Sequence, residues 1–341
     1  MIQYSTLFFS VIKKDAALRR SLRRNIGYLV KLLLSVYLQR KYNKLITINL
    51  TEHIGDVIAS EPIAYHVRKL HPKAFIIWSV NKQYKELVCY NPNINAVMEL
   101  TCLTEWIIIK KIFRPFVRIY DLHINGKRCS THRICNKNLT ARTLDFDNYL
   151  NHGNLLQVGA MAGGIKDLPD YQPKFHFRDP QQPRLIKSDY IVLHTLSNED
   201  ERNWSAKKWN ELVKRILAKY PSIHIVEIGL SNVIESNSVR YHNYTSKLDL
   251  QEIAHLIDTS VLFIGVESGF AHIANALSKN SIILIGYFQR FKNYMVYSGD
   301  FARGKNVRLL YYQGKLENLE TDEVTEAVNA RLQVTESTVV L

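Results

Sequence analysis

The stretch from Leu262 to Gly286 constrains the fold of this chain more than any other. Two short apolar runs, 262–264 and 281–285, have the length of buried strands. Between them lie a polar turn, 267–269, and a segment with helical spacing, 270–277. Strand, turn, helix and strand form a βαβ unit, whose connection is expected to be right-handed. The chain is therefore expected to contain a parallel sheet covered by helices.

Polar residues gather where the helix of this unit begins. Free backbone N–H groups and the helix dipole favour negative charge there, so ligands of open α/β sheets bind at such points. Gly269 lets a ligand approach the backbone, and Ser268 either caps the helix or donates to a ligand oxygen. Glu267 precedes them, and His272 projects from the same face of the first turn. Spacing alone equally allows a simple helix cap beside a half-buried histidine.

The N-terminal half shows the same alternation of strands and helices. A strand of β-branched residues is expected at Leu45–Asn49, followed by a helix from Val57 to Leu70 with Pro62 early in it. The further elements expected are the strands Phe75–Val80 and Val117–Leu122 and the helix Lys82–Tyr90. This pattern predicts a parallel sheet wrapped by helices.

Gly55 and Asp56 follow the first of these strands. Catalytic groups of such sheets usually lie at the carboxyl ends of the strands. Asp56 has a simple alternative role as the cap of the following helix. We favour a functional role, because Gly55 opens the backbone beside the carboxylate and because Glu52 and His53 are near.

Four prolines between Leu168 and Ser188 predict a linker, with a domain boundary near 180–188. A second series of strands and helices begins at Tyr190–His194. Its next elements are expected at Ser205–Tyr220 (helix), Ile223–Ile228 (strand) and Asp249–Ser260 (helix). We therefore expect two doubly wound domains, residues 44–183 and 184–333, facing each other across a cleft, and a tail at 334–341.

Residues 1–43 form a basic segment outside these domains. The formal net charge of the chain is +14, and residues 1–44 carry +9 of it. Apolar residues from Leu22 to Val36 follow a helical period, with basic residues around them. Such an amphipathic helix suits an anionic membrane surface, whereas the alternative is a helix packed on its own domain or on a second subunit. The apolar run is too short to span a bilayer comfortably, and no motif supports nucleic-acid binding.

Other motifs argue against several function classes. No Gly-x-Gly-x-x-Gly follows a strand, and no Gly-Lys-Ser/Thr loop is present, so neither a dinucleotide-dependent dehydrogenase nor an NTPase is indicated. Four cysteines in 341 residues do not form a disulfide framework, which fits a reducing compartment. Cys129, His132 and Cys135 offer metal ligands with His123 nearby, but Cys-x2-His-x2-Cys is not a usual zinc spacing, and we predict no metal site.

Several motifs in the same order resemble glycosyltransferase family 9, the bacterial heptosyltransferases. The resemblance covers roughly residues 44–333. Its motifs are Gly55-Asp56 with Pro62, His71-Pro72, Tyr120–Asn125, His194-Thr195, Arg202-x-Trp204, Trp209, Gly265–His272 and the closing segment Glu320–Leu332.

The resemblance implies a GT-B fold and an inverting transfer that needs no metal ion and no cofactor. It implies that Asp56 is the general base and that Arg202 contacts the diphosphate of the donor. Glu267, Ser268, Gly269 and His272 match the motif that holds the sugar and phosphates of the donor. Thr195, in the motif His194-Thr195, is a further donor-binding candidate. The candidates on the acceptor side are His53, Gly55 and His123. The chemistry fits these residue types, since a carboxylate can take the proton of a sugar hydroxyl while cationic and N–H groups stabilise the leaving diphosphate.

Position 267 departs from the family pattern, because Glu stands where Asp is usual. Because the side chain of Glu is longer, the sequence does not decide whether the donor is ADP-heptose, which is usual for the family, or a related nucleotide-sugar. The expected function is transfer to a cell-surface glycan such as the lipopolysaccharide core, at the inner face of the cytoplasmic membrane. The alternatives are a binding protein of the same fold without turnover, and another GT-B enzyme such as a nucleotide-sugar epimerase. The acceptor, the linkage and the oligomeric state do not follow from the sequence.

Overall fold

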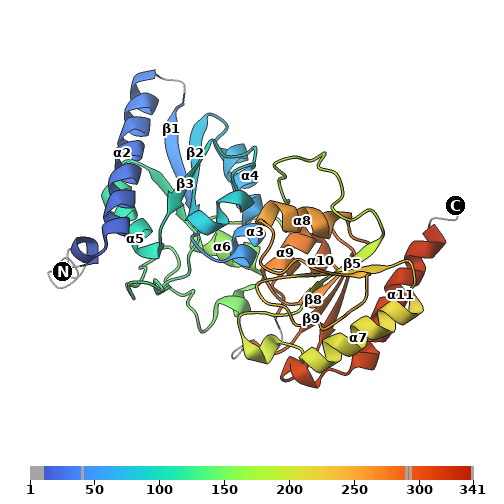
Figure 1. The fold of residues 1–341 in the computed structure, drawn as a ribbon. Helices are drawn as coiled ribbons and strands as arrows, with labels where there is room; N and C mark the ends of the chain where they lie inside the picture. Colours follow the sequence, from blue (N-terminus) through green and yellow to red (C-terminus); the bar gives the residue numbers. More distant parts are fainter. Residues whose placement is uncertain (1–10, 40–41, 289–290, 292–293, 339–341) are drawn as a thin grey trace. The chain divides into compact units, whose positions relative to one another are not determined.

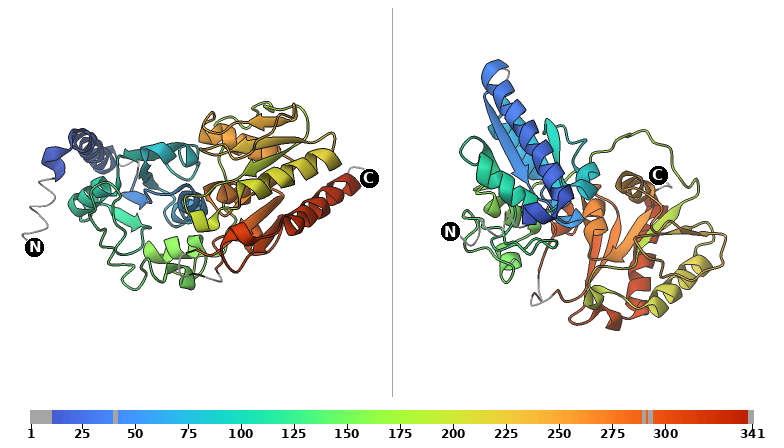
Figure 2. Two further views of the ribbon diagram at one scale, coloured as in Figure 1. Left: turned by 60° about the horizontal axis from the view of Figure 1, so that its bottom comes forward. Right: turned by 60° about the vertical axis from the view of Figure 1, so that its left-hand side comes forward.

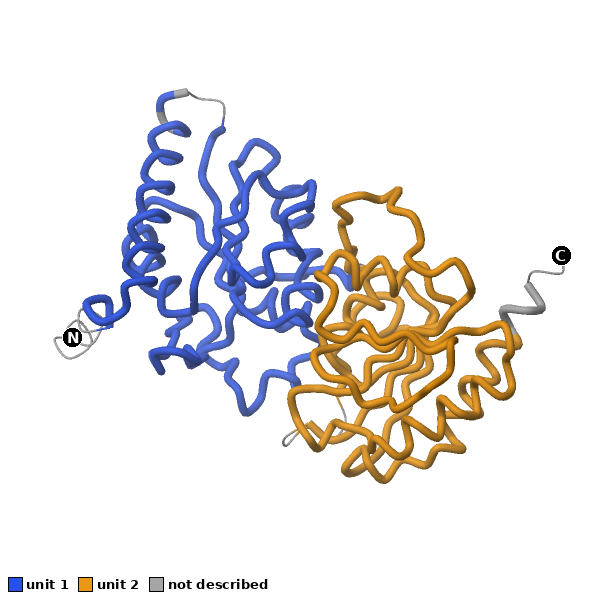
Figure 3. The backbone as a smooth tube through the Cα atoms, in the orientation of Figure 1, with its two compact units in different colours: residues 1–171 blue, residues 172–341 orange. Residues whose placement is uncertain are grey.

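The computed structural model describes residues 11–39, 42–288, 291 and 294–338. The chain divides into two compact units, residues 1–171 and 172–341 (Figure 3). Each unit contains one parallel sheet with helices on both faces (Figure 1). The expected pair of doubly wound α/β domains is therefore confirmed.

The sheet of the first unit has four strands in the order β3-β2-β1-β4. They are β1 (Lys44–Asn49), β2 (Ala74–Asn81), β3 (Ala96–Leu100) and β4 (Arg118–Asp121). The first strand is central, and all its residues after Lys44 are buried. The chain moves outward from β1 to β3 and then returns to the other side of β1 with β4. The strand order therefore reverses between β1 and β4, where ligands of such sheets bind.

Helices cover both faces of this sheet (Figures 1 and 2). One layer contains α2 (Ala16–Gln39) and α5 (Leu103–Phe113), and the other contains α3 (Ile54–Ala59), α4 (Glu61–Leu70) and α6 (Leu155–Ala162). The single helix expected at 57–70 is divided at Ser60, and Pro62 lies in the first turn of α4, where its missing N–H group costs nothing. The helix expected at 82–90 is the 3-10 helix η1 (Lys82–Leu87).

The N-terminal helix packs on its own domain. Leu18, Leu22 and Leu29 of α2 are buried in one hydrophobic cluster with residues of α5 and of the sheet. Asn25 is buried as well, and its Nδ2 donates to Glu105 Oε1 at 2.8 Å and to the Glu99 carbonyl at 2.9 Å. Within the part of the chain that the structure describes, no helix combines the length and the apolar character needed to cross a bilayer. Residues 1–10, 40 and 41 of the expected basic arm lie outside the described residues.

The sheet of the second unit has six strands in the order β10-β9-β8-β5-β6-β7. They are β5 (Tyr190–His194), β6 (His224–Ile228), β7 (Tyr241–Asn243), β8 (Leu262–Val266), β9 (Ser281–Ile285) and β10 (Val307–Tyr311). The expected βαβ unit is β8, α9 (Gly269–Ala276) and β9, and its two strands pair directly. The strand order reverses between β5 and β8.

Helices of the second unit also form two layers. The helices α7 (Ala206–Lys219) and α11 (Thr321–Thr338) lie side by side on one face (Figures 1 and 2). On the other face lie α8 (Leu250–Thr259), α9 and the short α10 (Gly299–Ala302). Two 3-10 helices complete the unit, η3 (Asp200–Arg202) and η4 (Leu316–Asn318). Trp209, Leu212 and Ile216 of α7 are fully buried, because the apolar face of this amphipathic helix meets the sheet.

The boundary between the units lies earlier than the proline-rich segment suggested. The structure divides the chain after Tyr171, not near residue 183. The segment from Gln172 to Pro183 belongs to the second unit because its polar groups bond there. Gln172 Oε1 accepts from the Asp300 N–H, the Arg178 N–H donates to Gln251 Oε1 at 2.8 Å, and the Pro183 carbonyl accepts from His255. The expected tail is partly helical as well, since α11 continues to Thr338.

Two leucines of α2 test whether this helix is part of the first domain. Leu29 is fully buried, whereas Leu34 is 55% exposed. We expect Leu29→Ala to lower the free energy of unfolding by about 2–5 kcal/mol, because it leaves a cavity in a packed core. The control Leu34→Ala should change it by less than about 0.5 kcal/mol. Urea denaturation of both variants gives the comparison, and equal small effects would mean that α2 is a detached arm.

Candidate active site

The candidate donor site lies where the strand order of the second sheet reverses. Chain segments leaving β5 and β8 meet at this point, because the two strands are parallel neighbours. Glu267 follows β8, Ser268 is the N-cap of α9, and Gly269 is its first residue. The structure thus brings together three of the residues that the sequence assigned to the donor.

Arg202 joins this group from the 3-10 helix η3. Its guanidinium forms an ion pair with Glu267 Oε2, and both side chains are largely buried, at 13% and 7% exposure. Burial alone would lower the pKa of Arg202, but the Glu267 carboxylate raises it above its usual value. The guanidinium carbon also lies 4.6 Å from the centre of the Phe288 ring, a cation–π distance. Arg202 is therefore held as a fixed positive charge beside the N-terminus of α9.

Ser268 contacts a second buried side chain, His194, at the carboxyl end of β5. The distance from Ser268 Oγ to His194 Nδ1 is 3.0 Å. Burial lowers the pKa of His194 to about 3, so the ring is neutral at neutral pH. A neutral imidazole fixes the Ser268 hydroxyl without placing a charge there. Gly229, with φ +134°, passes beside the ring, and a Cβ atom at this position would lie 3.4 Å from His194 Cδ2.

Thr195 and His272, the other two residues that the sequence assigned to the donor, are both buried. The Thr195 hydroxyl donates to Glu227 Oε1 at 3.0 Å, and both residues are buried. Glu227 also accepts from Tyr241 and from the Val233 N–H group, so this carboxylate organises the turn after β6. His272 is 2% exposed, and its ring centre lies 4.7 Å from that of Tyr297. Their roles as donor contacts stay predictions, and the structure adds that the Thr195 hydroxyl is engaged by Glu227 and that His272 is buried beside Tyr297.

Asp56 lies in the first turn of α3, at the carboxyl end of β1. Its Oδ2 accepts the backbone N–H of His53 at 3.0 Å, so the carboxylate closes the start of the helix. The alternative that Asp56 is the cap of this helix is wrong, because His53 is the N-cap and Asp56 is the third helical residue. Gly55 is buried beside it, and the exposed His53 ring lies 3.5 Å from Glu52 Oε2.

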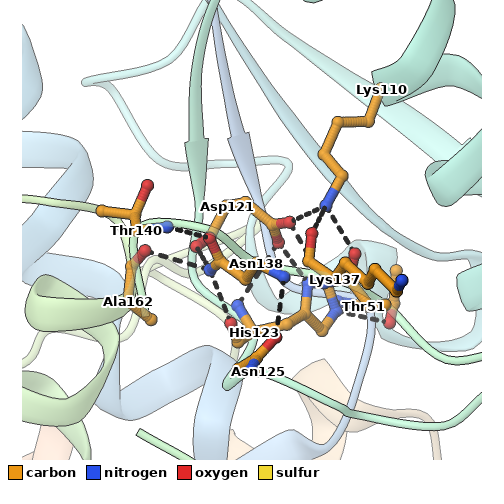
Figure 4. A network of polar contacts seen from close by, with 10 residues as sticks. Thr51, Lys110, Asp121, His123, Asn125, Lys137, Asn138, Thr140 and Ala162 are labelled. Carbon is orange, nitrogen blue, oxygen red and sulfur yellow. Dashed lines mark hydrogen bonds and ion pairs between the residues drawn. The ribbon is translucent and has the colours of Figure 1, made fainter. Parts of the chain in front are cut away.

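His123 belongs to a buried network that joins the ends of β1 and β4 (Figure 4). Its Nδ1 lies 2.7 Å from Asp121 Oδ1, and its Nε2 accepts the Thr51 N–H at 3.0 Å. Lys110 Nζ bonds Asp121 Oδ2 at 2.7 Å. Burial would raise the pKa of Asp121, but His123 and Lys110 hold it well below its usual value. Both ring nitrogens of His123 are thus engaged in positioning the loop after β4.

The sequence of this chain is similar to those of known glycosyltransferases. Residues 159–291 match the family model described as glycosyltransferase family 9 (heptosyltransferase). The curated lipopolysaccharide heptosyltransferase 1 of Campylobacter coli is 23% identical, over 70% of this chain and 83% of that protein. The chain is a glycosyltransferase that resembles family 9.

Solved structures agree with the fold of this glycosyltransferase. The E. coli ADP-heptose lps heptosyltransferase II has a TM-score of 0.63 and 17% identity, with 86% of this chain and 99% of that chain covered. The iron-containing dodecameric glycosyltransferase TibC of enterotoxigenic E. coli has a TM-score of 0.57 and 17% identity, with 86% of this chain and 77% of that chain covered. The predicted GT-B class is thereby confirmed.

Three groups of the candidate donor site have no role assigned from the sequence. His194 stands in the motif His194-Thr195 without an assigned function, and Phe288 and Tyr294 belong to no motif. Tyr294 OH lies 3.5 Å from Glu267 Oε2, and Phe288 lies against Arg202. Only His194 carried a usable signal, since it ends a buried strand next to the point where the strand order reverses.

The Arg202–Glu267 pair predicts a measurable coupling energy. Arg202→Met and Glu267→Gln each leave one buried charge without its counter-charge, so each is expected to lower the free energy of unfolding by about 3 kcal/mol. The double variant should cost less than the sum of the two, by about 1–3 kcal/mol. Urea denaturation of the four proteins completes the cycle. Additive losses would show that the two side chains do not interact in solution.

Proposed function

We propose that this glycosyltransferase transfers heptose from ADP-heptose to a lipopolysaccharide-type core glycan, with inversion at the anomeric carbon and without a metal ion. The names of the similar proteins, which include lipopolysaccharide heptosyltransferase 1 and ADP-heptose lps heptosyltransferase II, support this donor and acceptor. The observation that carries the proposal is the buried pair of Arg202 and Glu267 beside the N-terminus of α9.

This arrangement suits a nucleotide diphosphate. Among the described residues, none accepts a hydrogen bond from the buried Nε of Arg202. We assign this donor and the N–H groups at Ser268 and Gly269 to the diphosphate oxygens, since a helix N-terminus favours anions. These groups supply the charge stabilisation that a metal ion gives in other transferases. Arg202 and Tyr294 both approach Oε2 of Glu267, and we assign Oε1 to a hydroxyl of the donor sugar.

Asp56 is the proposed general base. The acceptor hydroxyl oxygen forms a bond to the anomeric carbon while the bond from that carbon to the diphosphate breaks. The hydroxyl proton passes to Asp56, and ADP leaves with the bonding electrons and the new negative charge. Attack from the side opposite the leaving group inverts the configuration. The contact with the His53 N–H uses only part of the acceptor capacity of the Asp56 carboxylate. The remaining lone pairs are those that we assign to this proton.

The direct test is mass spectrometry of products from ADP-heptose and a panel of core-glycan acceptors. We expect an acceptor that gains one heptose, with inverted configuration by NMR, when no divalent cation is added. An epimerase would change the donor without using the acceptor, and a protein that only binds the donor would release no ADP.

Asp56→Asn separates the chemistry from the fold. Asn can still accept the His53 N–H, so we expect the thermal midpoint and the affinity for ADP-heptose to stay near wild type. The transfer rate should fall by about 10²–10⁴-fold, because the amide cannot take the proton. The control Asp145→Asn changes a carboxylate that makes a similar backbone contact in an exposed loop, and it should keep full activity. Near wild-type turnover of Asp56→Asn would remove Asp56 as the base.

We further propose that the solvent-facing side of α2 binds the inner face of the cytoplasmic membrane. Among the described side chains of this helix, three large apolar ones are exposed, Val30 at 43%, Leu34 at 55% and Leu38 at 78%. Basic residues accompany them on the exposed surface: Arg20, Arg23, Arg24 and Lys31. Such a combination suits the surface of a bilayer with anionic lipids.

The membrane proposal is best tested without deleting α2, because the helix is part of the core. Arg20→Gln, Arg23→Gln and Lys31→Gln together remove three positive charges, each worth about 1 kcal/mol at an anionic surface. We expect sedimentation with phosphatidylglycerol-containing vesicles to weaken by about 100-fold. The control with Lys207, Lys214 and Lys219 of α7 changed to Gln carries the same net charge and should bind as wild type. Equal losses in both triple variants would show general charge attraction and refute a docking face on α2.

A further inference from the structure

Two cysteines and a histidine from distant parts of the first unit meet outside the candidate active site. Cys102 directly precedes α5, and Cys129 and His132 lie in the loop after β4. Both thiols are buried, and the His132 side chain is 12% exposed. The loop is held in shape by backbone bonds, since the Cys129 N–H donates to the Ile134 carbonyl at 2.8 Å and the Arg133 N–H donates to the Cys129 carbonyl at 2.9 Å.

The three side chains have the separations of a tetrahedral metal site. His132 Nδ1 lies 3.5 Å from Cys102 Sγ and 4.0 Å from Cys129 Sγ. All three atoms lie within 4.8 Å of one another. Zinc bonds of ~2.3 Å to sulfur and ~2.0 Å to nitrogen place these ligand atoms ~3.5–3.8 Å apart in a tetrahedron. Shifts of at most about 1 Å would therefore complete the geometry.

Asp15 orients the histidine for this role. Its Oδ2 lies 3.2 Å from His132 Nε2, while its Oδ1 accepts the Leu18 N–H at 2.9 Å at the start of α2. A proton on Nε2 directed at Asp15 leaves the lone pair of Nδ1 facing the two sulfurs. Histidine ligands of metals have this arrangement, in which a carboxylate fixes the second ring nitrogen.

We propose that Cys102, Cys129 and His132 bind one zinc ion, with Asp15 as the positioning residue of His132. Two thiolates and an imidazole favour zinc over magnesium or calcium, which prefer oxygen ligands. The thiols bind as thiolates and release their protons to solvent. A water molecule completes the four ligands on the side where His132 is partly exposed.

The zinc ion would fasten three segments that are distant in sequence. Asp15 directly precedes α2, and Cys102 directly precedes α5. Cys129 and His132 lie in the loop after β4, which also carries His123. The site therefore has a structural role in the first unit, separate from Arg202 and Asp56. It takes Cys102 where the sequence pattern had offered Cys135, a difference that only the tertiary contact reveals.

Metal analysis of the full-length protein, purified with reductant and without chelator, tests the proposal. We expect about one zinc ion per chain. Cys102→Ala and Cys129→Ala should abolish binding, and Co²⁺ in place of zinc should give a tetrahedral spectrum with thiolate-to-cobalt charge transfer. Asp15→Asn keeps all three ligands and the contact with the Leu18 N–H, and it should weaken zinc binding by about 10–100-fold in competition with a chelator. Zinc should also raise the thermal midpoint of the wild type by several degrees.

Cys135→Ala is the matched control, since it removes the remaining cysteine of the same loop. It should keep full zinc content. An equal loss in Cys135→Ala and Cys129→Ala would overturn the ligand assignment. Wild-type protein that takes up no zinc or cobalt with free thiols would show that the three groups only hydrogen-bond to one another. Recovery of a Cys102–Cys129 disulfide from freshly prepared protein would also overturn the proposal.

Discussion

Charged side chains at the carboxyl ends of two buried parallel sheets need partners, and this requirement organises both units. In the second unit Glu267 follows a strand whose residues are all buried, and Arg202 supplies the opposite charge. In the first unit Asp121 ends β4 and is held by Lys110 and His123. An unpaired charge at either place would cost several kcal/mol. The loops that carry Arg202 and His123 are thus fixed by the same forces that stabilise the sheets.

The parallel arrangement of the strands also brings the residues of the proposed reaction together within each unit. Parallel strands end together, so the point where strand order reverses collects the loops of two neighbouring strands. At this point of the second unit lie a fixed guanidinium, a helix N-terminus and a neutral histidine, which together favour a diphosphate. At the corresponding point of the first unit, Asp121 and His123 are engaged in bonds that hold the loop after β4. Asp56, in the helix after β1, is the carboxylate that we propose for proton transfer.

The N-terminal helix has two faces of different character. Its inner face contributes Leu18, Leu22 and Leu29 to the core, and Asn25 ties it to α5 through Glu105. This packing is the alternative that the sequence left open beside a membrane-binding arm. The two readings are compatible, because the outer face retains basic and apolar side chains.

The sequence by itself determined the two series of strands and helices, the βαβ unit at 262–285 and the position of Glu267, Ser268 and Gly269 at a helix start. Periodicity and turn residues are local, so these features can be read from short windows. It also gave Arg202 and Asp56, but only through the resemblance to a family. Tertiary structure alone decided that Arg202 pairs with Glu267, that Thr195 serves Glu227, that His123 is engaged at both nitrogens, and that Cys102 joins Cys129 and His132. Those contacts link residues far apart in the chain, and no local pattern specifies them, because they depend on which loops the strand order brings to the same edge of a sheet.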